Sequence, residues 1–356
     1  MATAALLLAP AVLVATAPGV SPGLADLLGF AFAVAVALRI AALLMFEVVS
    51  DPLPRRRESE AKVALHEPLK PAPGKLDESK PLTYLQTLLR NDRPFDAVNE
   101  LDRLQSLDLA DTEDPSTRAC VDEIRLEILK LTTSLEAGEE VWTKSFKHRG
   151  VQIYTSKLNK RDFKVVDVAR DTGLFDLVSL IYETDLYHKW VPGCVQASRT
   201  RPSIFRQFAY MRFTVPIPMV KDRHILIKGY GDVFQGKSVM IYIQSVEASP
   251  ELEATLNVQP GSVACTLEHA GMLFTPSGPD TEIQLMSRID LGLAIVPDSV
   301  FDHAAKYILA EMIHFLKLKA SKACVSSQKH EPWRRRQIED SAVYDEARVR
   351  LNAMTI

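Results

Sequence analysis

The sequence has few cysteines, almost no net charge and none of the common catalytic motifs. Four cysteines occur in 356 residues, and no two of them form a Cys-x-x-Cys pair. They are Cys120, Cys194, Cys265 and Cys324. Such isolated cysteines are typical of reduced, partly buried thiols, not of a disulfide scaffold or a zinc site. No Asn-x-Ser/Thr sequon occurs either, so nothing in the sequence indicates a glycosylated, secreted protein.

An excess of positive charge is also missing. Forty-two Lys and Arg residues oppose 45 Asp and Glu residues, which gives a net charge of −3. A protein that binds nucleic acid through the phosphate backbone needs a positive surface. We therefore expect no nucleic-acid partner.

The absence of catalytic motifs argues against an enzyme. The sequence contains no GxGxxG, HExxH or GxSxG motif, and its eight histidines show no metal-ligand spacing. Cys265 and His269 share one face of an expected strand, but a separation of four residues puts them about 13 Å apart. We expect no catalytic residue, no metal and no cofactor.

A long apolar segment lies near the N-terminus. Leu27–Phe46 contains one charge, Arg39, and twenty helical residues span about 30 Å, the thickness of a bilayer core. Three arginines follow at positions 55–57, and the positive-inside rule then places the rest of the chain in the cytosol. We predict that residues 1–50 anchor the protein in a membrane. The alternative is a targeting segment that is removed from a soluble organelle protein.

A linker and an acidic helical region follow. Residues 51–80 contain five prolines and many charges without apolar periodicity, which is typical of a linker. Residues 81–137 repeat apolar residues at helical spacing. Residues 91–140 hold 5 Lys or Arg against 14 Asp or Glu, a net charge of −9. This acidic surface is either a solvated face or a docking surface for a basic protein partner.

Residues 138–320 predict an α+β domain. Seven segments have strand-like composition, with turn residues between several of them. They are Gly150–Ser156, Phe163–Ala169, Phe205–Val215, His224–Tyr230, Ser238–Val246, Ala264–Phe274 and Glu282–Leu291. A helix over residues 174–187 interrupts the early strands, and a long helix with a wide apolar face begins after Pro297. This order predicts a curved antiparallel sheet around the last helix. We expect residues 321–356 to form a polar tail with a short helix near residues 338–351.

Several of these segments together resemble the StAR-related lipid-transfer, or START, domain family over about residues 138–320. They are Gly150–Ser156, Tyr187–Pro192 with its Trp-x-Pro, Pro216–Lys228 with its Asp222-Arg223 turn, and the long last helix. The resemblance implies a helix-grip fold, in which a curved antiparallel sheet and a C-terminal helix enclose an apolar tunnel for one lipid. It also implies lipid binding and transfer at a membrane surface without covalent chemistry. The ligand would be a phospholipid, a sterol or a sphingolipid.

The same resemblance implies which residues form the site. The last helix would be the lid, and the loop Val215–Asp222 would be a gate beside the mouth. The residues expected to contact the lipid are Trp190, Arg212, Phe213, Lys228, Met286, Arg288, Ala304, Ile308 and Met312. The residues expected to form the gating loop are Pro216, Ile217, Pro218 and Met219.

One pair of positions departs from the family's pattern. Sterol-binding members often bury an acidic residue paired with an arginine, but the acidic position falls here near Tyr210 and Arg212. Lys228 lies within a residue of the expected arginine. A sterol preference therefore does not follow. Arg212 and Lys228 would favour an anionic or phosphate-bearing headgroup if they face the tunnel, and they would be ordinary solvent-facing side chains if they do not.

Two other functions remain open. An enzyme on the related Bet v 1-type fold needs a polar catalytic pair inside the cavity, for which His269 with Glu268 or Arg288 is the candidate. A scaffold protein would use the acidic helices to recruit a partner and would leave the pocket without a ligand. In the tail, Trp333 and the arginines at 334–336 belong either to a soluble segment or to a contact with anionic lipid headgroups.

Overall fold

The structure is a computed structural model, and it describes residues 83–354 apart from residues 92, 108, 110–112, 215–220, 291–297 and 324–330. The expected membrane anchor at residues 1–50 and the linker at residues 51–80 lie outside the described residues. So do the four expected gating residues, Pro216, Ile217, Pro218 and Met219. Of the helices in the described ranges, none has both the length and the apolar composition needed to cross a membrane.

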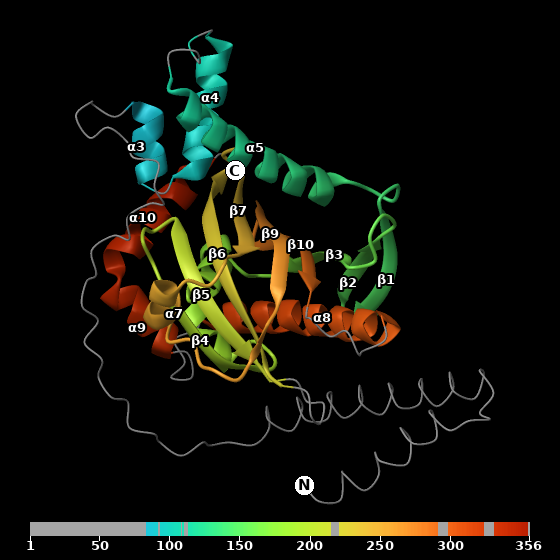
Figure 1. Cartoon of the computed structure of the whole chain (residues 1–356). Helices are drawn as coiled ribbons and strands as arrows, with labels where there is room; N and C mark the ends of the chain where they lie inside the picture. The colour runs from blue at the N-terminus through green and yellow to red at the C-terminus, as the bar shows by residue number, and fades with distance from the viewer. Residues whose placement is uncertain are drawn as a thin grey trace, which may run out of the picture.

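A large sheet forms the centre of the molecule (Figure 1). In the described part of the chain it has ten strands, with the main path in the order β1-β2-β3-β10-β9-β7-β6-β5-β4. All pairs along this path are antiparallel, and the short β8 pairs in parallel with β6. The strands are β1 (Trp142–His148), β2 (Val151–Ser156), β3 (Asp162–Ala169), β4 (Cys194–Thr200), β5 (Arg206–Phe213), β6 (Arg223–Phe234), β7 (Ser238–Ser245), β8 (Val263–Ala264), β9 (Thr266–Ser277) and β10 (Asp280–Asp290).

Helices cover both faces of this sheet. Figure 1 shows α5 and α8 on opposite sides of it. The first group is α3 (Tyr84–Arg90), α4 (Pro94–Ser106) and α5 (Pro115–Glu136), of which α4 contacts β6 and α5 contacts β10. The second group is α6 (Leu174–Tyr182), the 3-10 helix η2 (Thr184–Lys189) and α8 (Asp298–Ala323), and α8 contacts β1, β2, β3 and α6. The remaining helices are α7 (Pro250–Leu256), α9 (Glu331–Glu339) and α10 (Ser341–Asn352).

Local sequence signals explain where several of these elements begin and end. Thr83 and Gln86 form a capping box at the start of α3, and the Asp114 side chain accepts from the backbone of Thr117 at the start of α5. A turn at Gln235-Gly236 joins β6 to β7, and both of its residues have positive φ. This is the geometry of a type I′ turn, which fixes the register of a tight hairpin.

The two faces of the sheet bury separate apolar clusters. The inner cluster lies between the sheet, α6 and α8, and its members include Val165, Phe274, Ile283, Leu285 and Ile313. The outer cluster lies between the sheet and α3–α5, and its members include Leu85, Leu101, Leu131, Met240 and Met286. The acidic helices are therefore part of the folded body, because their apolar faces cover one side of the sheet.

The C-terminal segment differs from the expected polar tail. Residues after 330 form two helices, α9 and α10, which bury Trp333, Tyr344 and Met354. Trp333 and Met354 belong to the inner cluster. The folded body thus extends to about residue 354, since removal of these helices would expose part of its core.

Candidate functional site

The inner face of the sheet is apolar along its central strands. Inward residues pair across neighbouring strands, as Val165 does with Leu285, Leu285 with Met272, and Met272 with Ile241. Val165 and Leu285 are buried, whereas Met272, Ile241 and Ile243 remain partly accessible. A central strand has neighbours on both sides, so the accessible surface of its inward side chains lies on the inner face of the sheet.

Two glycines lie opposite these accessible side chains. On β6, Gly231 pairs with Ile241 and Gly229 pairs with Ile243, which gives both glycines the inward parity. A Cβ added at Gly229 would meet its nearest atom, the carbonyl oxygen of Tyr242, at 3.8 Å, an ordinary van der Waals contact. β6 therefore has no side chain at two successive inward positions. A glycine inside a strand often marks a place where a ligand or another backbone comes close to the sheet.

The long helix α8 covers the inner face beside β1–β3 and is held there by ion pairs. Glu311, with 4% of its side chain exposed, lies 2.8 Å from Nε of Arg149 and 2.7 Å from Nε2 of His148, both in the β1–β2 hairpin. Lys317 forms a second ion pair, with Asp167 of β3. The partly buried residues that α8 packs against the inner cluster are Leu309, Met312 and Phe315.

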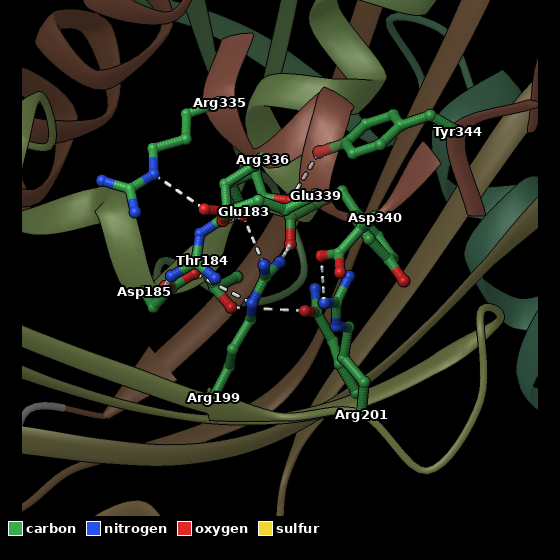
Figure 2. A network of polar contacts seen from close by, with 12 residues as sticks. Glu183, Thr184, Asp185, Arg199, Arg201, Arg335, Arg336, Glu339, Asp340 and Tyr344 are labelled. Atoms are coloured by element: carbon green, nitrogen blue, oxygen red, sulfur yellow. Dashed lines mark hydrogen bonds and ion pairs between the residues drawn. The ribbon is translucent and has the colours of Figure 1, made fainter. Parts of the chain in front are cut away.

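A buried charge network holds η2 against β4 (Figure 2). Glu183 lies between α6 and η2, is completely buried, and forms an ion pair with Arg199 of β4. Nε of Arg199 also lies 2.8 Å from Asp185 in η2. Tyr344 of α10 donates to Glu183, and Arg336 of α9 lies 2.9 Å from Asp185. The network therefore fixes the segment that leads into the Trp-x-Pro motif and ties it to the two C-terminal helices.

The two thiols of the inner cluster are not activated. Burial raises the pKa of Cys194 to about 12 and that of Cys265 to about 11. Both thiols are protonated at neutral pH and are therefore poor nucleophiles. His269, considered above as a partner of Cys265, lies on the outer parity of β9 opposite Arg288.

Three residues expected to contact a lipid belong to the inner cluster or pack against it. Trp190 is 7% exposed, and Phe213 and Met312 are partly buried. Two expected residues of α8 are not among the described residues that pack in or against the inner cluster. They are Ala304, which is partly buried, and Ile308, which is 42% exposed. The residues that α8 contributes to the inner cluster itself are Ala305, Ala310, Ile313, Leu316 and Ala320.

Four other expected contacts lie on the outer face. Met286 packs in the outer cluster, and Arg288 forms an ion pair with Asp162. Nζ of Lys228 lies over the ring of Tyr230 at 6.0 Å, and Nε of Arg212 lies 3.5 Å from Asp222. The reason is the two-residue alternation of a strand. The inward positions beside these residues are occupied by Met211, Ile227 and Leu285.

Sequence reasoning missed two features of this site. The inward glycines carry a readable signal, because a Gly-x-Gly spacing inside a strand puts both glycines on one face. The pair of Glu183 and Arg199 carries no such signal, since a turn and a strand must fold before the two residues meet.

Comparisons with known proteins show similarity at the level of the fold. No protein-family model matches the sequence, and no curated protein is similar enough in sequence to be matched. Human STARD10 is 15% identical, with a TM-score of 0.50 over 60% of this chain and 86% of that chain. The human StAR-related lipid transfer protein 5 is 11% identical, with a TM-score of 0.48 over 58% and 98% of the two chains. A fragment of the STAR-related lipid transfer protein from Xanthomonas axonopodis is 13% identical, with a TM-score of 0.42 over 50% and 98%.

The expected fold is confirmed by this similarity and by the topology of the sheet. An antiparallel sheet whose inner face is covered by a long helix near the C-terminus is the arrangement that the START resemblance implied. This chain therefore contains a START-like domain with the helix-grip fold.

Proposed function

We propose that the domain binds one lipid in the layer between the sheet and α8 and transfers it between membranes. The observation that carries this proposal is the partial accessibility of Ile241, Ile243 and Met272 on the inner face of central strands. The two inward glycines of β6, Gly229 and Gly231, leave the facing surface without side chains. The START-like fold supports the same reading.

Apolar surface is the chemistry that such a carrier needs. A diacyl lipid has roughly thirty methylene groups, and at about 0.8 kcal/mol each their exposure to water costs on the order of 24 kcal/mol. An inner face lined by Ile, Val, Leu, Met and Phe side chains replaces most of that contact with water. No bond has to be made or broken.

The proposal includes a membrane tether. Leu27–Phe46 is long and apolar enough in sequence to span a bilayer. A flexible linker of 30 residues has a root-mean-square span of about 30 Å, which would keep the carrier near one membrane and raise its effective concentration there. Partition of the full-length protein into the membrane pellet after a carbonate wash tests this part separately.

Transfer of fluorescent lipids from donor to acceptor vesicles tests the carrier function. We expect the full-length protein to accelerate transfer of NBD-labelled phosphatidylcholine, ceramide or cholesterol in a saturable way. Gly229→Leu should reduce that rate severalfold, because the new side chain enters the inner layer. Its Cβ fits without a clash, and leucine suits a strand better than glycine, so the fold should be retained.

Thr143→Leu is the matched control, because Thr143 is exposed on the edge strand β1. It adds a leucine to a strand outside the inner layer and should leave the transfer rate unchanged. Equal transfer by wild type and Gly229→Leu would place the ligand elsewhere. No transfer of any of the three lipids, together with a lipid-free mass in native mass spectrometry, would contradict the carrier proposal and favour the scaffold.

A further inference from the structure

The long helix α8 carries an ion pair at two positions of its otherwise apolar inward stripe. Four residues of this stripe belong to the inner cluster or pack against it, namely Leu309, Ile313, Leu316 and Ala320. They recur at alternating intervals of four and three residues, the spacing that keeps side chains on one face of an α-helix. Continued toward the start of α8, the same spacing reaches Lys306 and then Asp302.

Neighbouring residues of the helix support this direction. With about 100° between successive helical residues, Asp302 projects between Leu309 and Ile313, and Lys306 projects between Ile313 and Ala310. These three neighbours all lie in the inner cluster or pack against it. Both charged side chains therefore point along the face of α8 that packs in the inner layer.

The ion pair is largely withdrawn from water. Nζ of Lys306 lies 2.6 Å from Oδ2 of Asp302, with 11% of the lysine side chain and 34% of the aspartate side chain exposed. In the pair of Arg335 and Glu339 on α9, which has the same i,i+4 spacing, these fractions are 71% and 44%. Taking two charges out of water is costly, and the attraction between them often fails to compensate. Stability alone is therefore a poor explanation for this pair.

Both members of the pair keep unused hydrogen-bonding capacity. Oδ1 of Asp302 is buried and has no partner among the described residues. Within the same part of the chain, Asp302 is the one partner found for Nζ of Lys306, although an ammonium group has three N–H donors. The pair can therefore accept one more hydrogen bond and donate up to two.

The position of the pair fits the polar end of a lipid. Asp302, one turn closer to the start of α8 than the buried Lys306, is partly exposed, and the apolar stripe continues from Leu309 to Ala320. A lipid that lies along this stripe would place its acyl chains against the apolar positions and its headgroup at the charged ones. An ammonium group binds the anionic oxygens of a phosphate, and a carboxylate accepts from an amine.

We infer that Asp302 and Lys306 form the headgroup subsite and favour a phospholipid that carries both a phosphate and an amine. Lys306 donates to a phosphate oxygen, and Oδ1 of Asp302 accepts from the amine. This inference rests on the proposed lipid-binding function and specifies its ligand class. It assigns headgroup recognition to α8, in place of Arg212 and Lys228 on the outer face of the sheet.

Competition among three lipids with identical oleoyl chains tests the inference. The probe is phosphatidylethanolamine with an NBD label on one acyl chain, bound to the full-length protein. The competitors are dioleoyl phosphatidylethanolamine, dioleoyl phosphatidylethanol, which has the phosphate without the amine, and dioleoylglycerol, which has neither. Wild type should bind the first roughly tenfold more tightly than the second, and the second roughly tenfold more tightly than the third. One charge-assisted hydrogen bond at each step has an effect of this size.

Substitutions should remove the two preferences one at a time. Lys306→Met should abolish the preference for phosphatidylethanol over dioleoylglycerol, and Lys306→Arg should retain it. Asp302→Ala should abolish the preference for phosphatidylethanolamine over phosphatidylethanol. The double variant Asp302→Ala/Lys306→Met leaves no charge without its partner, so it should keep the melting temperature of the lipid-free protein and bind all three lipids equally. The matched control, Glu339→Ala/Arg335→Met, removes the exposed pair of α9 and should leave all three affinities unchanged.

The outcomes separate the two levels of the proposal. If wild type binds none of the three lipids, the proposed function itself fails. If wild type binds all three equally, the function stands and this inference is wrong. The inference is also wrong if the double variant binds lipid with the preferences of wild type, because the headgroup then lies elsewhere.

Discussion

Substitution at Glu183 should show how strongly the C-terminal helices are joined to the rest of the domain. Its carboxylate is completely buried, and its partner Arg199 has 5% of its side chain exposed. Removal of one partner of a buried ion pair costs about 3–5 kcal/mol, because the other charge stays buried without compensation. Glu183→Gln keeps the shape and removes the charge, so we expect it to lower the free energy of unfolding by an amount in this range.

A second substitution probes the same carboxylate from the other side. Tyr344 of α10 donates its hydroxyl to Glu183, and a hydrogen bond to a charged group contributes about 1.5–3 kcal/mol. We expect Tyr344→Phe to cost that much alone and less in the Glu183→Gln background, since the hydroxyl would there donate only to a neutral amide oxygen. The control is Arg335→Ala, whose ion pair with Glu339 is exposed, with 71% and 44% of the two side chains accessible.

Equilibrium unfolding in urea measures these differences, with the midpoint and the slope fitted for each variant. Hydrogen exchange at α9 and α10 gives a local reading, because a weakened network should speed exchange there first. The reasoning would be wrong if Glu183→Gln destabilised the protein no more than Arg335→Ala does. It would also be wrong if the unfolding free-energy changes of Glu183→Gln and Tyr344→Phe were fully additive, because the two residues would then not be coupled.

Two further predictions concern the outer face of the sheet. Gly271→Ala should lower the free energy of unfolding by about 1–3 kcal/mol, because the new Cβ would lie 2.1 Å from Cδ2 of Leu131 in α5. Urea unfolding measures this loss. In a Leu131→Ala background the same substitution should cause no further loss. Burial, followed by repulsion from Arg288, lowers the pKa of His269. The unfolded chain then binds the proton first as the pH falls below about 6.5, so stability should decrease from pH 7.5 to pH 5.5. His269→Gln should reduce that decrease, and an identical decrease in the variant would contradict the assignment.

The central strands could be predicted from the sequence because their inward positions are buried or partly buried and mostly carry apolar residues at every second place. β7 and β10 carry mostly apolar residues at the inward positions, and Met240 and Tyr242 of β7 and Met286 of β10 also pack in the outer cluster. The edge strands β1 and β4 were missed for the opposite reason. Their sequences, WTKSFKH and CVQASRT, are mostly polar and largely accessible, and they become strands because a neighbour offers backbone partners on one side.

The site could be predicted only in part, because its residues depend on which face of a strand turns inward. Trp190 and Phe213 were expected at the inner layer and lie there. Met286 and Arg288 share the parity that ordinarily faces water, and in the structure that parity faces outward. The alternation of a strand can be read from the sequence. Which of its two faces turns inward also depends on where the covering helices pack, and that is set by the tertiary fold.

Glycines on the two faces of the sheet indicate where space has been left. On the outer face, a Cβ at Gly271 would collide with Leu131, so the missing side chain is replaced by a helix that packs directly on the strand. On the inner face, a Cβ at Gly229 would meet only ordinary contacts at 3.8 Å, and the neighbouring Ile243 remains partly accessible. Gly271 thus permits close packing of a helix on the outer face, whereas Gly229 leaves room for a side chain on the inner face. This difference supports the proposal that a lipid lies beside Gly229 of β6 on the inner face, and it does so without any similarity to known proteins.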